Sequence, residues 1–161
     1  ITLLEEVLPR STLVEGPDSF PCAVAGQTIH SLDHLRRLSE ERRNELVLKI
    51  CGANPQSARS YGVLMGHGLS SETWQAWIDE RVRQRQPFIV QERVETAVAR
   101  LAVKNISRRC AELFDCRLLL RPWVVGEELV SVHGCAVPRH TLRVHGRVDM
   151  AVLPVEFGTV N

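Results

Sequence analysis

The sequence has few lysines and little net charge. Of its 161 residues, 18 are arginine and two are lysine, and the formal net charge at pH 7 is +1. Acidic and basic residues are interspersed along the chain. This balance gives no electrostatic case for a nucleic-acid-binding protein, although the arginines leave room for local anion sites.

Long apolar runs and targeting segments are also missing. No run of eighteen apolar residues occurs, and no basic segment followed by an apolar one opens the chain. We therefore expect neither a membrane span nor a secretion signal, and we expect a cytoplasmic protein. The first residue is Ile1 rather than methionine, so we also expect a fragment of a longer protein.

Paired cysteines are lacking as well. The number of cysteines, five, is odd, their spacing is irregular, and no C-x-x-C pair occurs. We expect reduced, mostly buried thiols. The densest set of histidines, His133, His140 and His145, lies beside Cys135. Strand alternation would send such neighbours to opposite faces, so we expect no metal cluster there.

The sequence does contain many apolar residues. They make up 44% of the chain, which is enough to form a hydrophobic core. Its length and composition predict one domain, or one domain with a small lobe, and the mixture of helix and strand patterns predicts an α+β fold.

Apolar spacing predicts the secondary structure. Helices are expected over 31–43, capped by Ser31, and from Ser70 to the residue before Pro87, with Trp74, Trp77, Ile78 and Val82 on one face. Residues 11–28 predict a loop with one or two short strands, and residues 95–112 are expected to include a loop or short helix. Strands are also expected over 46–50 and 62–66, which form a hairpin, and over 88–94. A further strand over 118–125 turns at Gly126 into a hairpin with 129–132.

One of the two lysines, Lys49, stands at the end of the strand 46–50, just before a loop that contains glycine. A lysine so placed can offer a point charge to a phosphate while the loop amides donate hydrogen bonds. The loop 51–63 matches neither the P-loop nor the dinucleotide fingerprint, so the position of Lys49 carries this hypothesis.

These residues together resemble a known family. Five segments in chain order look like the nucleotide-binding half of ATP-grasp proteins. They are the lysine strand, the small-residue loop, Gly62-Val63, the helix start Ser71-Glu72 with Trp74, and the strand from Phe88 to Val94. They are most similar to the bacterial circularly permuted group, over about residues 28–139. The resemblance implies an α+β fold of small antiparallel sheets packed with helices in two lobes, with ATP between them. The implied divisions are flanking strands and loop over residues 1–30, a lid-like lobe over 31–95, and a second, incomplete lobe over 96–161. The implied reaction is activation of a carboxylate by phosphoryl transfer from Mg-ATP, followed by attack of an amine or thiol.

Position by position, the resemblance assigns Lys49 to the ATP phosphates. It makes the loop from Gly52 through Ser60 to Gly62 a cover over them. The hinge is then Gln91, Glu92, Arg93 and Val94, whose backbone and Glu92 carboxylate read the adenine edge, as a strand end with a free carbonyl and N–H can do. The nucleotide site therefore requires that Lys49 and Glu92 line the same face of the sheet. Without the resemblance, these hinge residues would be the solvated end of a strand.

The resemblance also assigns two arginines and a metal set. Arg121 matches an arginine with a phosphate or metal-carboxylate partner, with a structural salt bridge as the alternative, and Arg139 is a candidate for a phosphate or a substrate carboxylate. Magnesium requires hard oxygen ligands, for which the tail offers Asp149, Glu156 and Asn161. The family's Glu-x-Asn pair is missing, which departs from its pattern.

Three functions therefore remain open at this level. The first is an ATP-dependent ligase module that acts on small-molecule carboxylate and amine substrates. The second is a non-catalytic ATP-grasp-like domain for nucleotide sensing or protein contact. The third is an unrelated α+β interaction module, in which Lys49 and the Gln-Glu pair have no special role.

Overall fold

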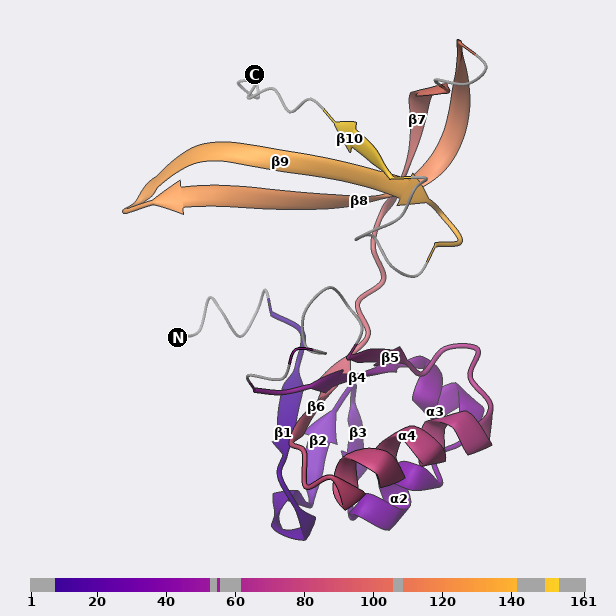
Figure 1. The fold of residues 1–161 in the computed structure, drawn as a ribbon, viewed down its shortest axis with the longest axis vertical. Helices are drawn as coiled ribbons and strands as arrows, with labels where there is room; N and C mark the ends of the chain where they lie inside the picture. Colours follow the sequence, from indigo (N-terminus) through magenta and orange to yellow (C-terminus); the bar gives the residue numbers. More distant parts are fainter. Residues whose placement is uncertain (1–7, 53–54, 56–61, 106–108, 142–149, 154–161) are drawn as a thin grey trace. The chain divides into compact units, whose positions relative to one another are not determined.

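The computed structural model describes residues 8–52, 55, 62–105, 109–141 and 150–153. The chain is α+β and divides into two compact units, Ile1–Val94 and Glu95–Asn161 (Figure 1). Among the described helices, none is long and apolar enough to span a membrane.

The first unit is built on a four-stranded antiparallel sheet in the order β1-β6-β4-β5. The predicted hairpin between 46–50 and 62–66 is confirmed. The region 11–28 was expected to hold one or two strands, but three begin there, because β2 and β3 form a hairpin of their own. The strands are β1 (Ser11–Val14), β2 (Cys22–Val24), β3 (Gln27–Ile29), β4 (Leu46–Ile50), β5 (Val63–Met65) and β6 (Phe88–Glu92), and a short 3-10 helix η1 (Pro17–Ser19) follows β1.

Three helices complete this unit: α2 (Leu32–Arg36), α3 (Glu40–Asn44) and α4 (Ser71–Arg83). The cap at Ser31 is confirmed, since its hydroxyl accepts a hydrogen bond from the His34 amide at 3.0 Å. The single helix expected over 31–43 is wrong. Ser39 accepts from the Arg42 amide at 3.4 Å and starts a second helix, so the chain turns between the two.

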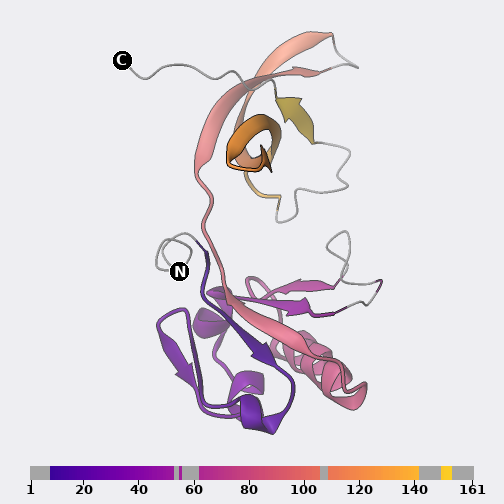
Figure 2. The same ribbon diagram turned by 90° about the vertical axis from the view of Figure 1, so that its left-hand side faces the viewer.

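The core lies between the sheet, the β2–β3 hairpin and the helices, with α2 and α4 on one side of the sheet (Figures 1 and 2). Trp74 and Ile78 of α4 are fully buried, as predicted, but Val82 is 40% exposed. At 3.6 residues per turn, seven residues make almost two full turns, so the side chain seven residues after Trp74 points in nearly the same direction as Trp74. That position is Arg81, which is buried and stacks over the Trp77 ring at 5.2 Å.

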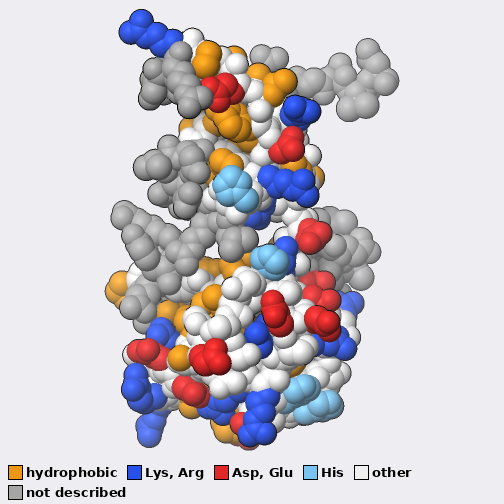
Figure 3. Space-filling model, turned by 90° about the vertical axis from the view of Figure 1, so that its right-hand side faces the viewer, with side chains coloured by type: hydrophobic (Ala, Val, Ile, Leu, Met, Phe, Trp, Pro, Cys, Tyr) orange, Lys and Arg blue, Asp and Glu red, His pale blue; other side chains and the backbone are white. Residues whose placement is uncertain are grey.

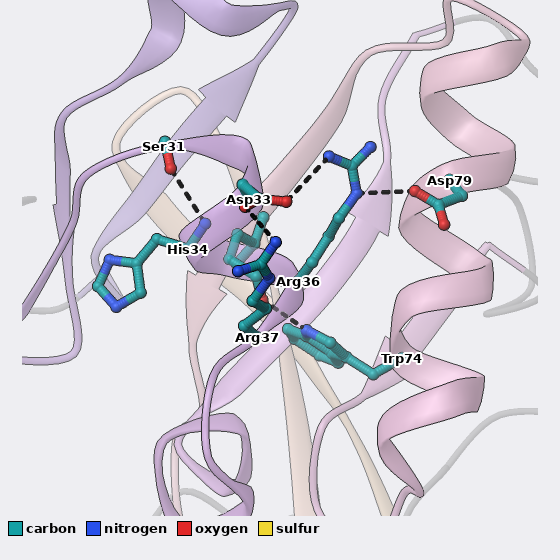
Figure 4. A network of polar contacts seen from close by, with 8 residues as sticks. Ser31, Asp33, His34, Arg36, Arg37, Trp74 and Asp79 are labelled. Atoms are coloured by element: carbon teal, nitrogen blue, oxygen red, sulfur yellow. Dashed lines mark hydrogen bonds and ion pairs between the residues drawn. The ribbon is translucent and has the colours of Figure 1, made fainter.

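Helices α2 and α4 are also joined by polar contacts (Figure 4). The indole Nε1 of Trp74 donates to the buried Leu35 carbonyl at 2.8 Å. Arg36 Nε pairs with Asp79 at 2.7 Å, and Arg37 pairs with Asp33 within α2 at 2.8 Å. The Trp74 bond satisfies a buried donor and fixes the spacing of the two helices, whereas the exposed ion pairs contribute little.

The second unit is a four-stranded antiparallel sheet in the order β10-β9-β8-β7. The loop expected within 95–112 is present at residues 95–97, but β7 and the start of β8, which were not expected, occupy most of the region and pair along eight positions. The predicted hairpin is confirmed, with Gly126 at φ +63° in its turn, where glycine is favoured. The strands are β7 (Val98–Asn105), β8 (Cys110–Val125), β9 (Glu128–Pro138) and β10 (Ala151–Leu153).

Candidate functional site

The two faces of the first sheet differ. Leu46 and Leu48 of β4 belong to the core cluster, together with Phe88 and Val90 of β6. Because side chains alternate along a strand, the residues between them point to the other side. We call this side the Lys49 face; it carries Leu13 of β1, Val47 and Lys49 of β4, Val63 and Met65 of β5, and Ile89 and Gln91 of β6.

Lys49 is the one titratable residue among these positions. Its register partners are Ile89 on one side and Val63 on the other, both apolar. Lys49 is half-buried, and burial lowers the pKa of its ammonium. Within the described part of the chain, no ion pair or hydrogen bond of the Lys49 side chain is found. The face thus presents a partly desolvated cation and no anion of its own.

Of the predicted hinge residues, Gln91 shares the Lys49 face and Glu92 does not. Gln91 lies opposite Val47, and its Nε2 donates to Ser11 Oγ at 2.9 Å. Glu92 lies opposite Leu46, which faces the core side. The expectation that Lys49 and Glu92 line one face is therefore wrong. Ile89 is the register partner of Lys49, and Glu92 stands three positions further along β6, where an odd number of positions reverses the direction of the side chain.

The hinge backbone is engaged within the protein. The Glu92 amide donates to the Arg10 carbonyl at 2.8 Å, and the Arg93 amide donates to the Glu45 carbonyl at 2.7 Å. The Arg93 side chain donates from Nη1 to the Asn44 carbonyl at 3.0 Å. These two amides are not open to an adenine ring, and the contacts of Arg93 hold the strand end in place. Val94 is 55% exposed.

The glycines at the ends of the predicted cover loop have structural roles. Gly52 has φ +91°, a backbone conformation that favours glycine, where the chain leaves β4. The buried Gly62 accepts a hydrogen bond from the Ile50 amide at 2.8 Å, which closes the β4–β5 hairpin. Ser60 lies outside the described residues, so its predicted phosphate contact remains a prediction.

The two predicted catalytic arginines belong to the second unit. Arg121 is half-buried in β8 opposite His133, and it makes contacts of its own. Arg139 follows β9, where its amide donates to the Asp115 carbonyl at 2.9 Å, and its side chain is exposed. Arg139 is six positions along the chain from His133, the register partner of Arg121, and most of this stretch is extended. The two arginines therefore stand about 20 Å apart along the strands and cannot share one phosphate.

The predicted magnesium ligands Asp149, Glu156 and Asn161 all lie outside the described residues. In the described ranges no group of three or more His, Cys, Asp or Glu side chains is placed to hold a metal ion. For the nucleotide, the cation on the Lys49 face fits a phosphate, while the engaged amides of Glu92 and Arg93 do not fit the adenine contact.

Ser11 was missed by sequence reasoning. It approaches Gln91 because β1 pairs with β6 across some eighty positions of chain, and no local signal marks such a pairing. Figure 3 shows acidic and basic side chains interspersed over the visible face of the first unit. The candidate site depends on Lys49, the one titratable residue among the positions of the Lys49 face.

Comparison of the chain with protein-family models, curated proteins and solved structures found no match.

Proposed function

We propose that the chain is an ATP-binding module of the ATP-grasp type, which holds the phosphates of Mg-ATP against Lys49 and transfers a phosphoryl group to a carboxylate that an amine then attacks. The observation that supports this proposal most directly is Lys49 itself: a half-buried cation on an apolar sheet face, with no counter-charge within the described residues.

The physical argument concerns the unpaired charge. Withdrawing an ammonium from water without a partner costs free energy, and a protein that keeps such a group in place needs an anion from elsewhere. A triphosphate offers several acceptor oxygens to the three ammonium donors. Val63 and Ile89 beside Lys49 exclude water, which strengthens the attraction between the charges.

On this proposal, Gln91 replaces Glu92 as the side chain that reads the base. Gln91 shares the Lys49 face, and its Nε2 already donates to Ser11. That bond fixes the amide so that Oε1 can accept from the exocyclic amine of adenine. Lys49 then binds the phosphates at one position and Gln91 the base at another.

Isothermal titration with Mg-ATP tests the binding step. We compare the wild type with Lys49→Met, which keeps the apolar stem and removes the charge. Lys104→Met is the matched control, because it removes the other lysine, which is exposed on β7. Losing one charge-assisted contact should weaken binding by about 1.5–3 kcal/mol, or roughly ten- to 150-fold, for Lys49→Met alone.

Two simpler ligands sharpen this titration. Inorganic tripolyphosphate should lose affinity in Lys49→Met as ATP does, whereas Gln91→Leu should weaken ATP and leave tripolyphosphate unchanged. Equal affinities of the wild type and Lys49→Met for ATP, or no binding at millimolar ATP, would refute the proposal.

A second candidate, a non-catalytic nucleotide-binding domain, is favoured by the missing Glu-x-Asn pair. Release of ADP that depends on an added carboxylate and amine would support the ligase. Saturable ATP binding without such turnover would support the second candidate. We place either activity in the cytoplasm, because all five cysteines are free thiols, as a reducing compartment keeps them.

A further inference from the structure

The two lysines of the chain stand in opposite environments. Lys49 is half-buried between Val63 and Ile89, whereas Lys104 is exposed on β7. None of the positions on the Lys49 face in β1, β5 and β6 carries a titratable side chain. Along β4 itself, Cys51 is the next position of the same alternation and follows the end of the strand. No neighbouring carboxylate on these strands therefore holds the proton on the Lys49 amine.

An amine attacks an electrophile only as the neutral base. An ordinary lysine is almost entirely protonated at neutral pH, and each unit by which its pKa falls raises the neutral fraction about tenfold. Burial lowers the pKa of Lys49. Lys49 is nevertheless not fully buried, so part of its side chain is open to a small reagent. Accessibility and a larger neutral fraction together make a lysine reactive.

We propose that Nζ of Lys49 is an acylation site for small activated acyl donors of the acyl phosphate class. The neutral amine attacks the acyl carbonyl carbon, and a nitrogen–carbon bond forms. The bond between that carbon and the phosphate oxygen breaks, its electron pair leaves with the phosphate, and the proton on nitrogen passes to water. The products are an amide on Lys49 and inorganic phosphate.

The surroundings of Lys49 suit the product. Val63 and Ile89 lie directly opposite it in the two neighbouring strands, where side chains approach within about 5 Å at Cβ. A short acyl chain placed there meets apolar surface. The amide is neutral, so the desolvation that penalises the ammonium is relieved when the bond forms.

Acylation would also regulate the same site. The modified side chain has no charge and cannot pair with a phosphate, so nucleotide binding would end. This regulatory consequence rests on the proposed function; the reactivity of Lys49 does not.

Acetyl phosphate is the probe, applied to the full chain at pH 8 with acetylation of each lysine followed by peptide mass spectrometry. Lys104 in the same molecule is the internal control. We expect Lys49 to be acetylated about threefold faster or more, in spite of its lower exposure. The same reaction in concentrated urea should make the two rates equal, because the advantage comes from the fold.

Three outcomes would overturn the acylation proposal: Lys104 reacts as fast as Lys49 in the folded protein, the ratio of rates is the same in urea, or neither lysine reacts. Lys49→Arg should remove the fast site and leave Lys104 unchanged. Adding Mg-ATP separates the two proposals. Fast acetylation that ATP does not slow refutes the nucleotide site and leaves the acylation site standing. ATP binding by a protein whose Lys49 is unreactive refutes the acylation site and leaves the nucleotide site standing.

Discussion

Arg43 and Lys49 are among the cations of the first unit that are withdrawn from solvent, and their contacts distinguish a structural role from a candidate function. Arg43 is buried, and its guanidinium donates to the carbonyls of Leu38 and Leu69 and to the hydroxyl of Ser71, at 2.7, 3.2 and 3.0 Å. These acceptors join α3 to the start of α4 and replace part of the water that Arg43 gives up. Lys49 has no such acceptors among the described residues, so its burial lowers stability and calls for another explanation.

The pH dependence of stability should expose this difference. The pKa of Lys49 is lowered in the folded state, so the unfolded chain binds this proton more tightly. The resulting destabilisation is fully present below the lowered pKa and fades as the pH rises from there to the ordinary value of 10.5. Lys49→Met should therefore be more stable than the wild type at pH 7, by a margin that shrinks towards pH 10.5.

Urea unfolding at a series of pH values measures this margin. Lys104→Met serves as the control and should differ from the wild type by no more than about 0.5 kcal/mol at every pH. If Lys49→Met proves less stable than the wild type at pH 7, Lys49 has a stabilising partner and the argument from the unpaired charge fails.

At the scale of elements, the backbone at Gly66 approaches the backbone at the end of α3 closely. Gly66 ends the β4–β5 hairpin, and its amide donates to the Leu46 carbonyl at 3.0 Å. A Cβ at this position would lie 1.9 Å from the carbonyl oxygen of Arg43, which is backbone and cannot rotate away. The turn after β5 is thereby packed against the end of α3, next to the contacts of Arg43.

Gly66→Ala should therefore destabilise the first unit by about 1–3 kcal/mol or more, the range for inserting volume where no space exists. Gly16→Ala is the matched control, since its φ of 177° is extended and no atom lies within 4 Å of the added Cβ. Chemical denaturation of both variants gives the comparison. Equal midpoints for the two alanine variants would contradict the close approach.

At the scale of the whole molecule, the chain is two units that fold around separate sheets. Within the described residues, every strand pairing lies inside Ile1–Val94 or inside Glu95–Asn161. The first unit has a contiguous core that draws on strands β1 to β6 and on two helices. Its length is in the range at which a single core suffices for independent folding.

Residues 1–94 should therefore fold without the rest of the chain, with a free energy of unfolding on the order of 5 kcal/mol. A dispersed amide spectrum and a cooperative urea transition would show this. A truncated chain that lacks a cooperative transition would mean that the first unit depends on the second for its stability.

Much of the local structure was predictable because its causes are local. Ser31 and Ser70 accept from amides three residues on, and the apolar residues of 46–50 and 88–92 suffice for buried strands. The failures have equally definite causes. The leucine spacing over 31–43 fits one continuous helix, and it hides the new helix that Ser39 starts. Strand β7 lacks the strong alternation that would mark a strand, so its pairing with β8 decides its structure.

The sequence by itself determined the α+β class, the helix caps and the hairpins β4–β5 and β8–β9, since each depends on residues close together in the chain. Only the tertiary structure decided which side chains share a face. Registers between β1, β6 and β4 join residues tens of positions apart, and a shift of one residue would reverse every side chain. The register places Gln91, and not Glu92, on the side of the sheet that carries Lys49.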